Sequence, residues 1–163
     1  MHDSLRLLPA EDAHFDWMIE EASPRYGLSL PPGGIHPADV LTLLRNVTAS
    51  VRTAQRPGMY LIVDADEVVG LCGFLRPPTD AGEVEIGYGI AGARQGRGFA
   101  TSAVRLLLDE AALDAGVQII VAGTAVNNPA SQRVLEKNGF DRCGEGHDED
   151  DGPTYRWMRA ARR

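Results

Sequence analysis

The residues best suited to chemistry in this 163-residue chain lie in one short stretch, Gln95 to Ala100. The stretch follows an apolar run, Val84 to Ile90, and leads into a helical pattern, so Gly96 and Gly98 stand where a strand turns into a helix. Glycine lets main-chain N–H groups approach a ligand closely. The start of the helix adds N–H donors and the positive end of the helix dipole. The stretch therefore predicts an anion site, and phosphate is the usual anion there.

This glycine stretch differs from the two common phosphate-binding loops. A P-loop carries Lys and then Ser or Thr after its last glycine, whereas Phe99 and Ala100 follow Gly98. A dinucleotide fingerprint needs a third glycine and a repeating parallel unit from the start of the chain. A connection that binds nothing stays an alternative at this point. The basic residues that an anionic ligand would need lie in or after the stretch: Arg94, Arg97, Arg105, Arg133, Lys137 and Arg142.

Length and composition predict one domain over residues 1–163. A hydrophobic content of 44% and a charged content of 24% fit a soluble globular protein with a sizeable core. The net charge of −7 and the pI near 5.0 argue against broad binding to nucleic acid or anionic membranes. We see no secretion signal and no bilayer-spanning run. Cys72 and Cys143 are expected to be free thiols. These features predict a cytoplasmic protein.

Apolar periodicity and turn formers predict a mixed α and β fold. In the first half, we expect helices over Glu11 to Glu21 and Ala38 to Val51, separated by a Pro- and Gly-rich loop, Ser23 to Pro37. The expected strands are Leu5 to Leu8, Met59 to Val63, Val68 to Leu75 and Val84 to Ile90, with a hairpin turn at residues 64–67.

The second half predicts two more helices and three more strands. An apolar stripe from Ala100 to Ala111 marks a long helix that Gly116 closes. The nearly all-apolar run Val117 to Ala122 predicts a central strand. Asn128 and Pro129 predict the N-cap and first position of a helix that ends at Asn138-Gly139. A final antiparallel pair, Phe140 to Cys143 and Thr154 to Met158, would flank an acidic loop from Gly144 to Gly152.

The order of these elements and three motifs resemble the GCN5-related N-acetyltransferase (GNAT) superfamily. The motifs are Gln-x-x-Gly-x-Ala at 95–100, Asn-Pro-Ala-Ser at 128–131 and Glu-Lys-Asn-Gly-Phe at 136–140. Glu85-Ile86-Gly87-Tyr88 ahead of Gly96 to Thr101 is similar to the RimJ/RimL-like branch of ribosomal-protein N-acetyltransferases. The resemblance covers nearly the whole chain. It implies an α+β, three-layer fold, in which helices flank a mixed, mostly antiparallel sheet of about seven strands with a splayed, V-shaped gap.

The resemblance implies acetyl transfer from acetyl-CoA to a primary amine by direct attack on the thioester in a ternary complex. The pyrophosphate would lie on N–H groups of Gly96 to Thr101, with Arg94 and Arg97 supplying charge. Backbone N–H groups near Gly89 and Ile90 would polarise the thioester carbonyl. The full expected cofactor set is Ile90, Arg94, Gln95, Gly96, Arg97, Gly98, Phe99, Ala100, Thr101, Asn128 and Ser131.

The same resemblance implies two catalytic residues. The acceptor amine must lose a proton before it attacks, and Glu85 is the expected base, because it lies on the strand that enters the gap. Glu83 points to the same side of that strand. Many relatives protonate the CoA thiolate with a tyrosine where this chain has Leu135, so Ser131 is the expected donor. Alternatively, Glu85 is a solvated glutamate on a strand, and Ser131 is a serine in the first helical turn that satisfies backbone donors there.

The expected acceptor contacts are Trp17, Tyr26, Glu83, Tyr88 and His147. Trp17, Tyr26 and His36 lie in segments that cover the acceptor pocket in relatives, although Trp17 also suits a core position. The four histidines lack metal-ligand spacing, so no metal is expected. The expected partner is a small-molecule or peptide amine, with no nucleic acid or membrane partner and with a homodimer as in many relatives. The alternative of another class is a non-catalytic acyl-CoA-binding sensor or interaction module.

Overall fold

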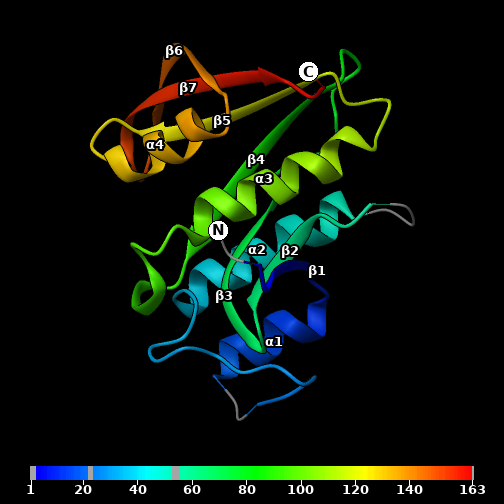
Figure 1. Cartoon of the computed structure of the whole chain (residues 1–163), viewed down its shortest axis with the longest axis vertical. Helices are drawn as coiled ribbons and strands as arrows, with labels where there is room; N and C mark the ends of the chain where they lie inside the picture. Colours follow the sequence, from blue (N-terminus) through cyan, green and yellow to red (C-terminus); the bar gives the residue numbers. More distant parts are fainter. Residues whose placement is uncertain (1–2, 22–23, 53–55, 163) are drawn as a thin grey trace.

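The computed structural model describes residues 3–21, 24–52 and 56–162, which form one seven-stranded sheet flanked by helices (Figure 1). The strand order is β1-β2-β3-β4-β5-β7-β6, and every neighbouring pair is antiparallel except β4–β5. The elements are β1 (Leu5–Pro9), α1 (Asp12–Glu20), α2 (Ala38–Val51), β2 (Met59–Asp64), β3 (Glu67–Phe74), β4 (Glu83–Ile90), the 3-10 turn η1 (Gly92–Arg94), α3 (Phe99–Ala112), β5 (Ile119–Ala125), α4 (Pro129–Lys137), β6 (Asp141–Asp148) and β7 (Gly152–Ala160). The predicted fold class is confirmed.

The two faces of the sheet bury two separate apolar clusters, because successive strand side chains point to opposite faces. On β2, Tyr60 and Ile62 join one cluster and Leu61 and Val63 join the other. The first cluster contains the buried stripe of α3, which the sequence predicted, together with Leu135 of α4. The second cluster contains Phe15, Trp17 and Met18 of α1 and Leu41 of α2. Helices therefore cover both faces of the sheet.

The parallel pair β4–β5 opens into a gap after three residues. Glu83, Val84 and Glu85 pair with Ile119, Ile120 and Val121. Beyond Glu85, β4 pairs only with β3, and β5 continues with β7. Figure 1 shows the two strands diverging toward the glycine stretch. The splay that the resemblance implied is thus present, and it exposes the β5-side edge of β4 from Ile86 to Ile90.

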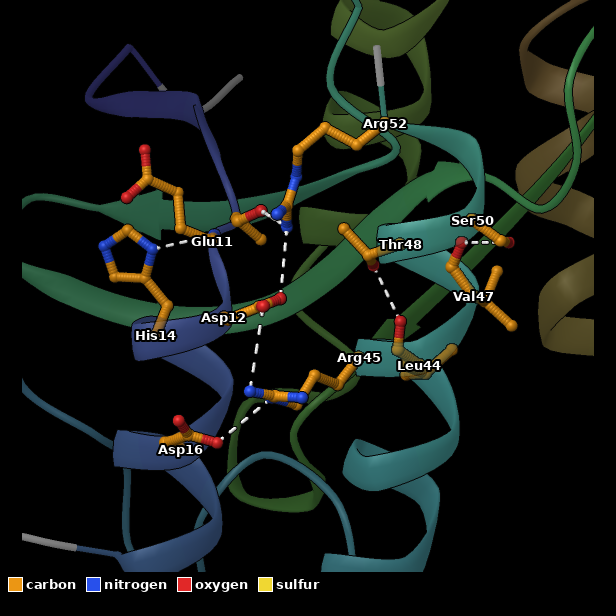
Figure 2. Close-up of polar contacts among 11 residues, drawn as sticks. Glu11, Asp12, His14, Asp16, Leu44, Arg45, Val47, Thr48, Ser50 and Arg52 are labelled. Atoms are coloured by element: carbon orange, nitrogen blue, oxygen red, sulfur yellow. Dashed lines mark hydrogen bonds and ion pairs between the residues drawn. The ribbon is translucent and has the colours of Figure 1, made fainter.

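Ion pairs hold α1 against α2 (Figure 2). Arg45 of α2 contacts Asp16 at 3.1 Å and Asp12 at 3.7 Å, and Arg52 contacts Asp12 at 3.6 Å. Arg52 also donates to the carbonyl of Ala10 at 3.0 Å. These contacts join the first half of α1 to the second half of α2 and so fix the position of one helix against the other. The segment between the two helices was predicted to be a loop, and it is one in residues 24–37, while Ser23 lies outside the described residues.

The final hairpin differs from its prediction. Its strands extend to Asp148 and from Gly152, so the acidic connection is only three residues long rather than the predicted Gly144 to Gly152. Gly144, Gly146 and the charged residues around them suggested a loop, yet β6 is an edge strand whose residues are nearly all exposed. An exposed edge strand needs no apolar alternation, so its composition hides it.

Candidate active site

A cavity of about 510 Å³ lies where the glycine stretch, the end of β4 and the start of α4 meet. Most of the predicted cofactor residues line it. The lining residues are Tyr88, Gly89, Ile90, Arg94, Gln95, Gly96, Gly98, Phe99, Ala100, Thr101, Asn128, Ala130, Ser131, Arg133, Val134 and Lys137. Of the predicted set, only Arg97 is absent from this lining, and its side chain is exposed. The structure therefore brings the segments around residues 90, 96 and 130 to one place.

The glycine stretch has the backbone that only glycine adopts readily. Gly96 and Gly98 have φ values of +77° and +80°, in the left-handed region. A Cβ at Gly96 would meet no atom within 4 Å, so backbone conformation and not space requires glycine there. Gly98 is the N-cap of α3 and provides no side-chain cap. First-turn N–H groups lack intrahelical acceptors, so the start of α3 offers donors and a partial positive charge to the cavity.

The basic side chains divide into two groups around the cavity. Arg94 donates to both carboxylate oxygens of Glu67, at 2.6 and 3.0 Å, so its guanidinium is already engaged by a carboxylate of the protein. Gln95 donates to the carbonyl of Ile90 at 3.2 Å, which ties the glycine stretch to β4. On the opposite wall, α4 contributes Arg133 and Lys137. The prediction did not include these two in the cofactor set, although their i, i+4 spacing after Pro129 puts them on one helix face.

Tyr88 and Ser131 form a pair of hydroxyl groups that joins β4 to α4. Tyr88 Oη lies 3.0 Å from the carbonyl oxygen of Ser131 and 2.8 Å from its Oγ. A phenol has one proton, so the pattern is satisfied when Tyr88 donates to the carbonyl and the Ser131 hydroxyl donates to Tyr88. Burial raises the pKa of Tyr88 to about 12, against a smaller opposing effect of the Ser131 hydrogen bond. Tyr88 is therefore a protonated phenol near neutral pH.

Asn128 caps α4, as the sequence predicted. Its side chain accepts a hydrogen bond from the N–H of Ser131 at 3.2 Å, and Pro129 occupies the first helical position. Leu135 lies one turn further along α4 and is fully buried in the cluster under α3. Position 135 is therefore a core position in this chain.

The carboxylates on β4 are engaged by arginines. Glu85 lies 2.7 Å from Arg76, and Glu83 lies 3.0 Å from Arg156 and 3.9 Å from Arg76. Both glutamates share a face of β4 with Gly87 and Gly89. At about 3.3 Å per residue, Glu85 stands roughly 13 Å along the strand from Gly89. Glu85 thus lies at the closed end of the gap, while the cavity lies at its open end.

The predicted acceptor contacts do not all surround one space. Trp17 is 1% exposed and belongs to the core beneath α1, so it has the core position that the sequence offered as the alternative to an acceptor contact. Tyr26 is 52% exposed and lies edge-on to Trp17 and His14 at centroid distances of 5.9 and 5.0 Å. His147 is exposed near the tip of the β6–β7 hairpin. Only Tyr88 lines the cavity.

Within residues 3–21, 24–52 and 56–162, no group of three or more His, Cys, Asp or Glu side chains is placed to hold a metal ion. His2 lies outside the described residues. The described helices are also too short or too polar to cross a membrane.

Comparison with known proteins agrees with this geometry. The acetyltransferase (GNAT) domain family matches residues 4–141. The ribosomal-protein-serine acetyltransferase of Escherichia coli (strain K12) is 32% identical over 82 residues, which are 50% of this chain and 46% of that protein. This relative agrees with the RimJ/RimL-like branch. The chain spans about half the length of the curated relatives that it matches.

Two solved structures share the whole fold. A putative GNAT-family acetyltransferase from Bordetella pertussis has a TM-score of 0.73 and 26% identity, with 98% of each chain covered. The aminoglycoside acetyltransferase AAC(6')-Ib in complex with coenzyme A has a TM-score of 0.70 and 21% identity, with 96% of this chain and 95% of that chain covered. Since the family match takes in residues 4–141 of 163, the chain belongs to the acetyltransferase (GNAT) domain family.

Proposed function

We propose that the protein transfers the acetyl group of acetyl-CoA to a primary amine, in a complex that holds both substrates at once. The observation that carries this proposal is the cavity, which joins the left-handed glycine stretch and the start of α3 to the splayed edge of β4. The family membership and the coenzyme A complex of AAC(6')-Ib support it.

The residues of the cavity fit the parts of acetyl-CoA. The N–H groups of Gly96 to Thr101 and the dipole of α3 suit the pyrophosphate. Arg133 and Lys137 add positive charge on the opposite wall, and Arg94, held by Glu67, adds to the local potential. The pantetheine arm would follow the unpaired edge of β4. Its amides would find there the backbone N–H and C=O groups that point away from β3.

At the open end of the gap, the backbone N–H groups near Gly89 and Ile90 would bind the thioester carbonyl oxygen, where negative charge develops during attack. Acetyl-CoA supplies the activated acetyl group. Tyr88 is the protonated hydroxyl beside this position, and Ser131 orients it through the hydrogen bond between them. We assign the return of a proton to the CoA sulfur to this pair, which extends the sequence prediction from Ser131 alone to Ser131 with Tyr88.

The acceptor is a peptide or small-molecule amine. The names of the relatives include a ribosomal-protein-serine acetyltransferase and an aminoglycoside acetyltransferase, so the family accommodates both kinds. Cys72 and Cys143 are free thiols, which suits the reducing cytoplasm as the place of the reaction. A homodimer stays a prediction.

Acetyl-CoA mixed with a panel of amines tests the function. The panel contains a peptide with an N-terminal serine, spermidine and ribostamycin, and release of free CoA thiol is followed together with the mass of each amine. We expect one amine to gain an acetyl group at a rate proportional to enzyme concentration. Binding of acetyl-CoA without transfer to any amine of a broader panel would instead favour the sensor or interaction module.

A further inference from the structure

Gly89 is in contact with the cavity and also with a histidine from the segment between α1 and α2. A Cβ at residue 89 would lie 3.0 Å from both Cε1 and Nε2 of His36. The imidazole edge therefore packs directly on the Gly89 backbone, and the absence of a side chain at residue 89 makes this approach possible. Gly89 also lines the cavity, at the place where the thioester carbonyl would bind.

The chain holds His36 in this place from both sides. Ile35 is 4% exposed in the cluster beneath α1 and α2, and Pro37 is the N-cap of α2. Upstream, Ser29 bonds through its backbone to Asp66 and Val68, at 2.8 and 3.0 Å. The ion pairs of Figure 2 fix α1 against α2, the two helices between which the segment runs. His36 is thus presented by an anchored segment.

The ring of His36 has no assigned structural task in the described part of the chain. No hydrogen bond or ion pair involves either ring nitrogen there, in contrast to His14, whose Nδ1 accepts from the Glu11 N–H at 3.0 Å. Burial lowers the pKa of His36 below its ordinary value of 6.5, and no charged group of the described residues contributes to that shift. The ring is therefore mostly neutral at pH 7, with one nitrogen able to accept a proton.

We infer that His36 is the general base that takes the proton from the acceptor amine, an assignment that rests on the proposed acetyltransferase function. Its ring lies against the residue that would hold the reacting carbonyl, whereas Glu85 stands roughly 13 Å along β4 and is held by Arg76. A base must come within hydrogen-bond reach of the proton that it removes. His36 lies against Gly89, next to the position where the amine would attack, whereas Glu85 could reach that position only through intervening water.

The proton and bond changes balance in this scheme. The ammonium form of the acceptor gives one proton to His36, which later returns it to solvent. The freed nitrogen lone pair forms the N–C bond with the acetyl carbon, and the C–S bond breaks with its electrons on sulfur. The thiolate takes a proton from the Tyr88–Ser131 pair, and the second proton that the nitrogen loses replaces it on that pair. The products are therefore the acetylated amine, CoA thiol and one released proton.

Three variants and a pH profile test the assignment, with acetyl-CoA saturating and the fastest amine of the panel as acceptor. For wild type, kcat/KM for the amine should fall on the acid side with a pKa below 6.5, since only neutral His36 accepts a proton. His36→Gln should lower kcat by about two orders of magnitude, the usual range for one acid–base group, and remove this acid limb. Glu85→Gln should keep the limb. His14→Gln, which removes a histidine outside the site, should keep both rate and limb.

A small base provides a second readout. Imidazole added to His36→Ala should restore part of the rate in proportion to the free-base concentration, and it should not restore His36→Gln, which has less space for it. Coenzyme A affinity, measured by calorimetry, should be that of wild type in each variant, which shows that the fold and the cofactor site are intact.

Several results would overturn the assignment while the proposed function stands. One is wild-type rate and acid limb in His36→Gln, and another is loss of the limb in Glu85→Gln. If His36→Gln fails to bind CoA, the titration of His36 Cε1–H by NMR in CoA-bound wild type decides. A pKa that matches the acid limb supports the base role, and a pKa above 6.5 contradicts it. Absence of transfer by wild type to any amine would overturn the function itself and the base role with it.

Discussion

At the level of single residues, the contact between Tyr88 and Ser131 joins the two sides of the candidate active site. Tyr88 lies near the end of β4 on one side of the splayed gap, and Ser131 lies in the first turn of α4 on the other. Their hydroxyl groups lie 2.8 Å apart, and the phenol also has the Ser131 carbonyl as a partner. The serine predicted to act alone therefore shares its position with a better proton donor, since a phenol is more acidic than an aliphatic hydroxyl.

Tyr88→Phe removes the phenol and keeps the ring. We expect kcat to fall by about tenfold to a hundredfold, because the thiolate loses its nearest acid and Ser131 alone remains. The KM for acetyl-CoA should change little, since the ring still fills its place against α4. Steady-state kinetics check this, and Ser131→Ala gives the comparison. An unchanged kcat in Tyr88→Phe would leave the tyrosine a structural link between β4 and α4.

Residue types and spacing predicted the lining of the cavity more fully than the side-chain contacts around it. Gly96, Gly98 and the Asn128 cap are local features, which the neighbouring sequence determines. The partners of Arg94 and Glu85 could not be predicted, because Glu67 and Arg76 reach them only through the pairing of β3 with β4. The contact of His36 with Gly89 joins residues 53 positions apart in an irregular segment, for which no periodic signal exists.

At the scale of elements, α4 combines a polar and a buried face. Ser131, Arg133 and Lys137 line the cavity, whereas Leu135 is fully buried against the α3 side of the sheet. Where many relatives have a proton-donating tyrosine, this chain therefore has a leucine that packs in the core. Burial of Leu135 thus helps to hold the cavity-lining face of α4 in place.

Leu135→Tyr tests this assignment of α4. A larger, polar ring at a fully buried position should destabilise the protein by about 1–3 kcal/mol, the usual cost of overpacking a core. The substitution should not raise kcat, because a tyrosine there points into the core. Urea unfolding measures the free energy, and the same kinetic assay measures the rate. Unchanged stability together with a faster rate would show that residue 135 reaches the cavity.

Most elements with an apolar pattern were predicted well, although β5 covers Ile119–Ala125 and not the predicted Val117 to Ala122. Both ends of α2 were predicted correctly. The observed bounds of the buried strands β2, β3 and β4 differ from the predicted bounds by at most one residue at each end. The strand β6 was predicted to end at Cys143, since its exposed edge carries glycine and charge in place of an alternating pattern. Hydrogen bonds to β7 hold it as a strand through Asp148.

At the scale of the whole molecule, the net charge of −7 is concentrated in part at one hairpin tip. Asp148, Glu149, Asp150 and Asp151 lie where β6 turns into β7. The Asp148 carboxylate accepts from the N–H groups of Asp150 and Asp151, at 2.8 and 3.0 Å, and these bonds hold its pKa below the ordinary value. The start of β7 pairs with the end of β5, so the tip projects from the half of the sheet that borders the gap.

Neutralising the tip should slow the capture of a cationic amine. We would replace Glu149, Asp150 and Asp151 by their amides and keep Asp148, because its carboxylate closes the turn. At low salt, kcat/KM for the amine should fall about threefold or more, and the loss should shrink as ionic strength rises, since salt screens steering. The kcat/KM for acetyl-CoA should not fall. Equal amine kinetics at low salt would limit the tip to a role in solubility.

The overall architecture was predictable because many weak signals agreed. Element order, turn residues and three motifs each indicated the same fold, and consistency across levels is what specifies a structure. The relative position of the segments around residues 36, 89 and 131 required the three-dimensional structure, because the splay of β4 from β5 sets it.

If acetyl-CoA binds with its pyrophosphate on the glycine stretch, a matched pair of aspartate substitutions should separate this site from the rest of the molecule. Gly96 and Gly27 have φ values of +77° and +71°, and a Cβ at either meets no atom within 4 Å. Only Gly96 lines the cavity. Aspartate at either position thus carries the same backbone strain and the same added charge, and only one of the two charges faces the ligand.

Calorimetric titration with coenzyme A gives the result. Wild type and Gly27→Asp should bind with similar affinity. The affinity of Gly96→Asp for coenzyme A should be lower by at least about a hundredfold, because a like charge placed against the phosphates costs several kcal/mol of binding free energy. Wild-type affinity in Gly96→Asp, or an equal loss in both variants, would contradict the cofactor site and the proposed function built on it.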